Sequence, residues 1–85
     1  MMKLPARYDH VGSNGKISFR RAGRMHHLGV GVEHRGARIL AIADDHTVTV
    51  VRLDTAEVIA TNEIDPARSY WRNTQKTPGR WPGVF

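Results

Sequence analysis

The sequence predicts a small all-β domain of five strands, either a barrel or a sandwich. Short apolar runs, several of them alternating with polar residues, recur at intervals of about 8 to 12 residues and are separated by turn residues. No segment has the apolar periodicity of a helix. The chain has 85 residues and no cysteine, so we expect one domain whose core depends on packing and backbone pairing, without disulfides or thiolate-bound zinc.

The first two expected strands form a hairpin. Residues 16–20 alternate polar and apolar side chains directly after the turn signal Asn14-Gly15, so Lys16, Ser18 and Arg20 should share the outer face. After a short turn the chain returns over residues 24–32. Two glycines alternate with the apolar residues there, which predicts a bulge, a sharp bend or the close approach of another backbone.

Three further strands are expected in the middle of the chain. Residues 38–43 are apolar on both parities, which indicates a central strand. Residues 47–53 are rich in β-branched side chains, and their alternation changes phase at Val50-Val51, where we predict a bulge. The fifth strand should cover residues 58–64. Aspartates between these strands are typical turn residues.

The two ends of the chain are expected to lie outside the barrel. Residues 1–14 read as an entry arm, and residues 15–65 as the β-domain. Residues 66–73 should form a short helical turn or cap, opened by Asp65 and Pro66. Residues 74–85, which include Trp81 and Phe85, are expected to be a flexible tail.

The net charge of +5 is arranged in three blocks. Residues 1–38 hold eight basic and two acidic residues, residues 39–65 hold one basic and six acidic residues, and residues 66–85 hold four basic residues and no acidic one. This segregation predicts one surface that neutralises phosphates and another that repels them. The alternative is a solvated surface on which the blocks mix after folding.

The sequence offers no convincing active site, so we expect no enzyme activity, no cofactor and no metal. Asp44 and Asp45 are explained by their turn. The adjacent His26 and His27 should project to opposite faces of a strand, so one metal ion cannot easily bind both. No serine lies in a motif that would activate its hydroxyl.

A cluster of cations is the stronger signal, because a planar guanidinium can engage two phosphate oxygens together. If the first three strands adjoin, the cations of the hairpin and of the next turn could form one continuous patch. The predicted DNA-binding residues are Lys16, Arg20, Arg21, Arg24, His26, His27, Arg35, Arg38, Arg68 and Arg72. For Tyr70 and Trp71 we favour a structural cap over a base-stacking role.

Residues 8–71 contain the motifs YDHVGSNGKISFR (8–20), GRMHHLGVG (23–31), VTVV (48–51) and DPARSY (65–70). Together they resemble the C-terminal region of integrase-like, DDE-type transposases of actinobacterial insertion sequences. In that family a catalytic core with an acidic metal-binding triad precedes a small SH3-like barrel that contacts transposon-end or target DNA. One departure is Ala56, where the family pattern has glycine.

The resemblance implies a five-stranded SH3-like barrel that binds double-stranded DNA without catalytic activity of its own. The expected partners are that DNA and other transposase subunits. No apolar run is long enough to span a membrane, and no signal peptide is visible, so we expect a cytoplasmic, nucleoid-associated protein.

Two other functions remain open. A protein-interaction module for transposase assembly would use exposed strand edges or aromatics. A barrel that binds single-stranded nucleic acid would instead stack bases on Phe19, Tyr70 or Trp71.

Overall fold

The computed structural model describes residues 6–75 and the backbone of residues 79–80, and the all-β class is confirmed. Eight strands and one short 3-10 helix follow the order β1 (Ala6–His10), β2 (Lys16–Arg21), β3 (Arg24–Gly29), η1 (Val32–His34), β4 (Arg38–Ala43), β5 (Thr47–Arg52), β6 (Glu57–Glu63), β7 (Tyr70–Trp71) and β8 (Gly79–Arg80). The five predicted strands correspond to β2 through β6.

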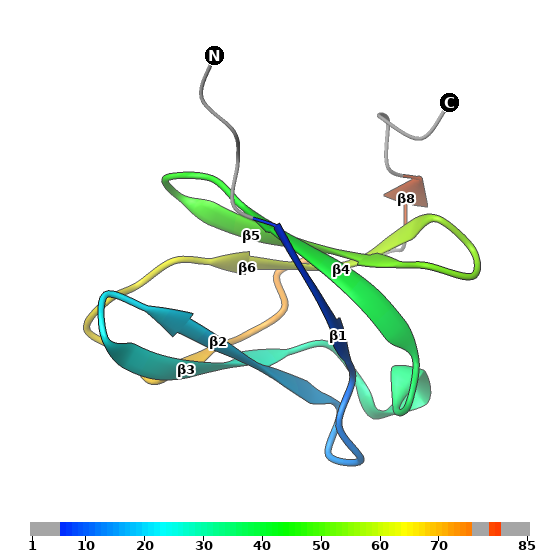
Figure 1. Ribbon diagram of the computed structural model, residues 1–85, viewed down its shortest axis with the longest axis horizontal. Coiled ribbons are helices and arrows are strands. Elements are labelled where there is room, and N and C mark those ends of the chain that lie inside the picture. Colours follow the sequence, from blue (N-terminus) through cyan, green and yellow to red (C-terminus); the bar gives the residue numbers. More distant parts are fainter. Residues whose placement is uncertain (1–5, 76–78, 81–85) are drawn as a thin grey trace.

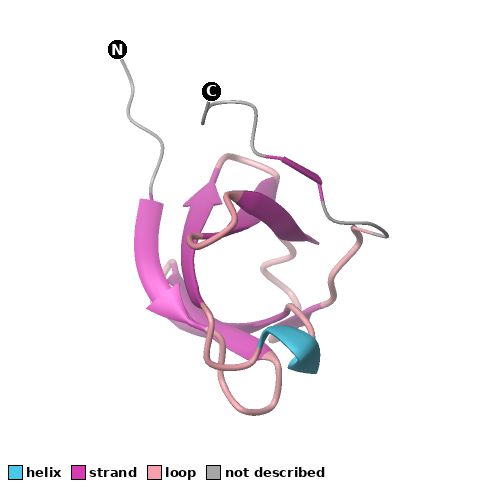
Figure 2. Cartoon of the chain, turned by 90° about the vertical axis from the view of Figure 1, so that its right-hand side faces the viewer, coloured by secondary structure: helices cyan, strands magenta, loops and turns pink. Residues whose placement is uncertain are grey.

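The described strands form two sheets and do not close into a single five-stranded barrel. One sheet has the order β1-β4-β5-β6-β8, and the other has the order β2-β3-β7. The three-stranded sheet lies below the five-stranded sheet in Figure 1. Seen from the side, the strands curve around a common interior, although β1 and β2 remain the outer strands of their sheets (Figure 2).

Both ends of the fold extend beyond the limits expected from the sequence. Residues 6–10, expected to belong to an arm, are strand β1, which pairs antiparallel with β4. Residues 66–73 contain no helical turn: Pro66 and Ala67 form a β-turn, closed by the Arg68 N–H donating to the Asp65 carbonyl at 3.0 Å, and β7 follows. Strand β8 lies within the expected tail. Trp81 and Phe85 lie outside the described residues.

A close backbone approach joins Gly15, just before the first hairpin, to the segment that follows β3. The N–H groups of Val30 and Gly31 both donate to the Gly15 carbonyl at 2.9 Å. A Cβ on Gly15, which has φ +77°, would lie 2.6 Å from the Val32 nitrogen, so no other residue fits there. Strand β3 ends at Gly29, and Val32 opens η1 directly after Gly31, which has φ +138°, so residues 30–32 do not continue the strand as predicted.

The core lies between the two sheets. Ile17, Leu28 and Trp71 enter it from the three-stranded sheet, and Ile39 and Val50 enter it from the five-stranded sheet. The predicted bulge at Val50 and Val51 is confirmed, since Val50 pairs with Ala60 while Val51 pairs with Val58. Ile59 is therefore the additional residue on β6, and it too joins the core.

Two asparagines join the sheets by hydrogen bonds. The fully buried Asn62 of β6 donates from Nδ2 to the carbonyls of Gly29, at 3.0 Å, and Trp71, at 2.8 Å. Asn73 donates from Nδ2 to the carbonyls of Val30 and Ile59. These bonds hold the segment around β7 beside β3 and β6, which determines where β7 presents its side chains.

Candidate nucleic-acid interface

The charge blocks of the sequence separate onto the two sheets. Residues 16–29 and 66–73, which form the three-stranded sheet and most of its adjoining turns, carry six Lys and Arg residues and no Asp or Glu, and Asp65 opens the turn before β7. Six of the eight acidic residues lie in the strands of the five-stranded sheet or in the turns between them: Asp9, Asp44, Asp45, Asp54, Glu57 and Glu63. The three-stranded sheet is therefore the basic side of the molecule.

The outer face of this sheet is set by strand register. Ile17 pairs with Leu28, and both are buried, so their neighbours along each strand point away from the core. Lys16, Ser18 and Arg20 of β2 thus share an outer face with Met25 and His27 of β3. We call these residues, together with Tyr70, the β2–β3–β7 face.

Tyr70 brings an aromatic ring to this face. Strand β7 runs parallel to β3, with Tyr70 opposite His27 and the buried Trp71 opposite Leu28. The Tyr70 hydroxyl occupies the space that a Cβ on Gly29 would need. The Lys16 Nζ lies 5.0 Å from the Tyr70 ring centroid, within reach of a cation–π interaction. Tyr70 is 45% exposed, so it belongs to the surface and not to a buried cap.

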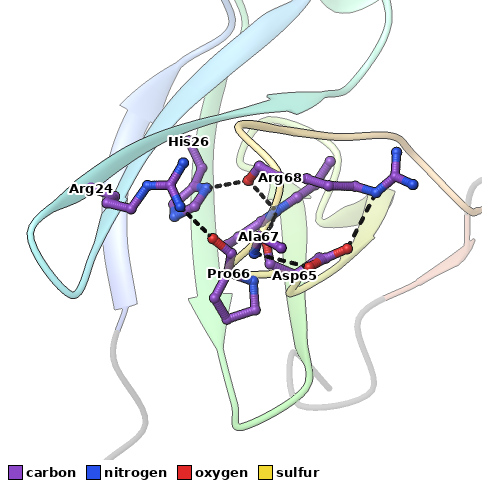
Figure 3. Close-up of polar contacts among 7 residues, drawn as sticks. Arg24, His26, Asp65, Pro66, Ala67 and Arg68 are labelled. Atoms are coloured by element: carbon purple, nitrogen blue, oxygen red, sulfur yellow. Dashed lines mark hydrogen bonds and ion pairs between the residues drawn. The ribbon is translucent and has the colours of Figure 1, made fainter.

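Three of the predicted DNA contacts instead hold the turn before β7 (Figure 3). Arg24 donates from a guanidinium nitrogen to the Pro66 carbonyl at 2.8 Å. His26 is buried, and its Nδ1 lies 2.7 Å from the Arg68 carbonyl, which can only accept, so Nδ1 carries the hydrogen. The Arg68 side chain forms an ion pair with Asp65 at 3.3 Å.

Trp71 completes this arrangement from the core side. Its ring is 2% exposed, stacks on His26 and lies tilted against Phe19. The indole Nε1 donates to the carbonyls of Asp65 and Arg68 at 2.7 and 3.1 Å. Trp71 thus packs as a structural residue, and Phe19 also packs against the core.

The remaining predicted contacts lie elsewhere, so the ten residues do not form one continuous patch. Arg21 pairs with Arg24 at the end of the hairpin, on the opposite parity from Arg20. Arg35 and Arg38 line a hollow with Arg52 and Asp54 at an end of the five-stranded sheet. Arg68 and Arg72 line another hollow, beside Glu63 and Asp65. Only Lys16, Arg20 and His27 share the β2–β3–β7 face.

The turn carboxylates behave as structural groups. The Asp44 Oδ1 accepts hydrogen bonds from the N–H groups of His46 and Thr47, both at 2.7 Å, and these bonds lower the pKa of Asp44. The Arg52 guanidinium, hydrogen-bonded to Asp54, lowers the pKa of that carboxyl. Within residues 6–75, no group of three or more His, Asp or Glu side chains is arranged to hold a metal ion.

No family model, curated protein or solved structure matches this chain. The resemblance of residues 8–71 to integrase-like transposases therefore rests on the residues quoted for it. Among the described residues, no helix has the length and apolar character needed to cross a membrane.

Proposed function

We propose that the chain is a non-catalytic DNA-binding domain that contacts double-stranded DNA, chiefly at phosphates, through the three-stranded sheet. One observation carries the proposal: residues 16–29 and 66–73 of this sheet hold six cations and no carboxylate, and Asp65 is the one acidic residue of the described turns that join its strands, whereas six of the eight acidic residues lie on the other sheet. A duplex approaching the basic side gains attraction and is kept from the acidic side by repulsion.

Lys16 and Arg20 are placed to make the first contacts. Both are exposed on β2, and neither forms an ion pair within the described part of the chain. His27 lies between them on the neighbouring strand, opposite Ser18. Arg24 and Arg68 contribute to the local potential, while their side chains also hold the turn before β7.

The choice of duplex DNA as the ligand comes from the resemblance to transposase C-terminal regions. It suggests transposon-end or target DNA as the partner, other transposase subunits as neighbours, and a place at the nucleoid. A β-sheet face inserts no helix into the major groove, so phosphate contacts should dominate over base readout.

An amide chemical-shift titration with a short duplex at two ionic strengths tests the proposal. We expect the amides of residues 16–20, His27 and Tyr70 to shift, and the binding to weaken strongly at the higher salt concentration. Arg38→Ala removes one arginine from the other sheet and should leave these shifts in place. Shifts confined to the five-stranded sheet, or binding that ignores salt, would refute the proposal.

A protein-interaction module is the second candidate, because Tyr8 is 70% exposed on β1, an outer strand of the five-stranded sheet. An isolated domain of that kind would self-associate in sedimentation experiments and show amide shifts on β1. For binding of a single strand, Tyr70 is the most exposed of Phe19, Tyr70 and Trp71, since Trp71 is buried in the core and Phe19 is half-buried against it. Oligothymidine that shifts Tyr70 more than a duplex does would favour that function.

A further inference from the structure

A second basic site lies on the five-stranded sheet, where β4 begins and β5 ends. Arg35 lies in the turn before β4 and Arg38 is the first residue of β4, while Arg52 is the last residue of β5 and is followed by Leu53 and Asp54. Antiparallel pairing brings these segments together, as the Leu53 N–H donates to the Arg38 carbonyl at 3.0 Å. These five residues line one hollow, which we call the arginine pocket. In Figure 1 the β2–β3 turn and η1, which precedes this pocket, lie toward opposite sides of the molecule.

One guanidinium of the pocket is fixed in place. Arg52 donates to both carboxylate oxygens of Asp54, from Nε at 2.8 Å and from a terminal nitrogen at 3.3 Å. Another terminal nitrogen lies 3.0 Å from His34 Nδ1. Since arginine can only donate, Nδ1 is the acceptor there. The single carboxylate of the pocket is thus matched by a single arginine.

Two further guanidiniums keep donors available. Arg35 uses one terminal nitrogen to donate to the Val32 carbonyl at 3.1 Å, which anchors the side chain within its own turn. Arg38 is exposed and forms no ion pair with any described residue. The pocket therefore carries two positive charges that no carboxylate lining it compensates.

We propose that the arginine pocket is a second phosphate-binding site, separate from the β2–β3–β7 face. Two guanidinium groups that line one hollow suit a tetrahedral group that offers several oxygens, and such charge-assisted bonds are among the stronger ones. The phosphoryl group belongs either to a free phosphate ester or to the phosphodiester backbone of a second nucleic-acid segment. The site does not depend on DNA binding by the other sheet.

Amide shifts of Gly36, Ala37, Arg38 and Leu53 provide the readout. Inorganic phosphate should shift them beyond any change caused by sodium chloride at the same ionic strength. Arg38→Ala and Arg35→Ala should each weaken that response by about tenfold, the effect of losing one charge-assisted hydrogen bond. Arg20→Ala, a matched loss of arginine on the other sheet, should leave it unchanged.

A short duplex in a second titration distinguishes the two sources. If excess duplex shifts the same amides, the phosphodiester backbone is the ligand, and if only inorganic phosphate does, the ligand is a free ester. Amides of the pocket that move with neither probe, or that lose their response equally in Arg20→Ala, would overturn the second site. Failure of the proposed DNA face would appear at different amides, those of residues 16–20, His27 and Tyr70.

Discussion

His26 and Trp71 stack with ring centroids 4.3 Å apart, and both rings donate a hydrogen bond to the same carbonyl oxygen, that of Arg68. One comes from β3 and the other from β7, so the shared acceptor ties the turn at residues 65–68 to the three-stranded sheet. A position predicted to contact DNA thus stabilises the sheet that presents the DNA-binding residues.

Trp71→Phe tests this relationship. Phenylalanine keeps much of the buried ring but loses the N–H that donates to the Asp65 and Arg68 carbonyls, so we expect the free energy of unfolding to fall by about 2 kcal/mol. Tyr70→Phe, the matched change at the exposed neighbour, should alter it by less than about 0.5 kcal/mol. Urea unfolding measures both, and equal effects would show that the indole hydrogen bonds contribute nothing.

The turn between β5 and β6 gives a second prediction. Ala56 has φ +58°, the left-handed conformation that glycine adopts without strain. Ala56→Gly should therefore raise the free energy of unfolding by relieving this strain. The greater entropy of glycine in the unfolded chain offsets part of the gain, so we expect a net increase of about 0.5 to 1 kcal/mol.

Ala60→Gly is the control for that change, because Ala60 is buried within a regular strand. It should destabilise the protein by about 1 kcal/mol. If both glycine variants lose stability in thermal or urea unfolding, the turn does not hold Ala56 in a strained conformation.

Local patterns could be read from the sequence, and long-range contacts could not. Short apolar runs between turn residues predicted the strands β2 to β6, and the change of phase at Val50-Val51 predicted the bulge. Parity also predicted that Lys16, Ser18 and Arg20 share a face. By contrast, Arg24 bonds to Pro66 and His26 to Arg68, each 42 residues away, and no local pattern signals such partners.

The missed strands have the same cause. Strand β7 has two residues and pairs parallel with β3, so it is too short to show a periodic pattern in the sequence. The asparagines whose hydrogen bonds hold its segment follow no sequence pattern either. Contacts between distant segments fix the turns that carry the arginines. The arginines consequently lie on several surfaces and not on one. Charge blocks along the sequence predicted the basic side of the molecule but not which cations share a face.

Acid should destabilise the fold through Asp44. Hydrogen bonds from the N–H groups of His46 and Thr47 lower its pKa in the folded state. The resulting stabilisation is complete above the unfolded pKa, near 4, and is lost as the pH falls through the lower folded pKa. Asp44→Ala should lower the urea midpoint at pH 7 and reduce its further decline between about pH 4 and pH 2.

Asp45→Ala serves as the control in the same turn, since its neighbour Asp44 provides the side-chain oxygen that accepts both backbone hydrogen bonds. Its acid profile should follow that of the unaltered protein. An Asp44→Ala profile parallel to that of the unaltered protein would mean that the Asp44 carboxylate adds no pH-dependent stability.

Arg20 and Arg24 should separate DNA binding from folding, although they lie on the same hairpin. Arg20 belongs to the β2–β3–β7 face, so Arg20→Ala should reduce the slope of log affinity against log salt by about 0.9 and leave unfolding unchanged. Arg24 donates to the Pro66 carbonyl, so Arg24→Ala should cost about 1 kcal/mol of stability. Because that guanidinium is held at the turn, its loss should change the slope less than the loss of Arg20 does.

Fluorescence anisotropy of a labelled duplex at several salt concentrations, with urea unfolding of each variant, measures both quantities. If the two variants change the slope equally, the potential of the whole sheet determines affinity, and the outer face has no special role.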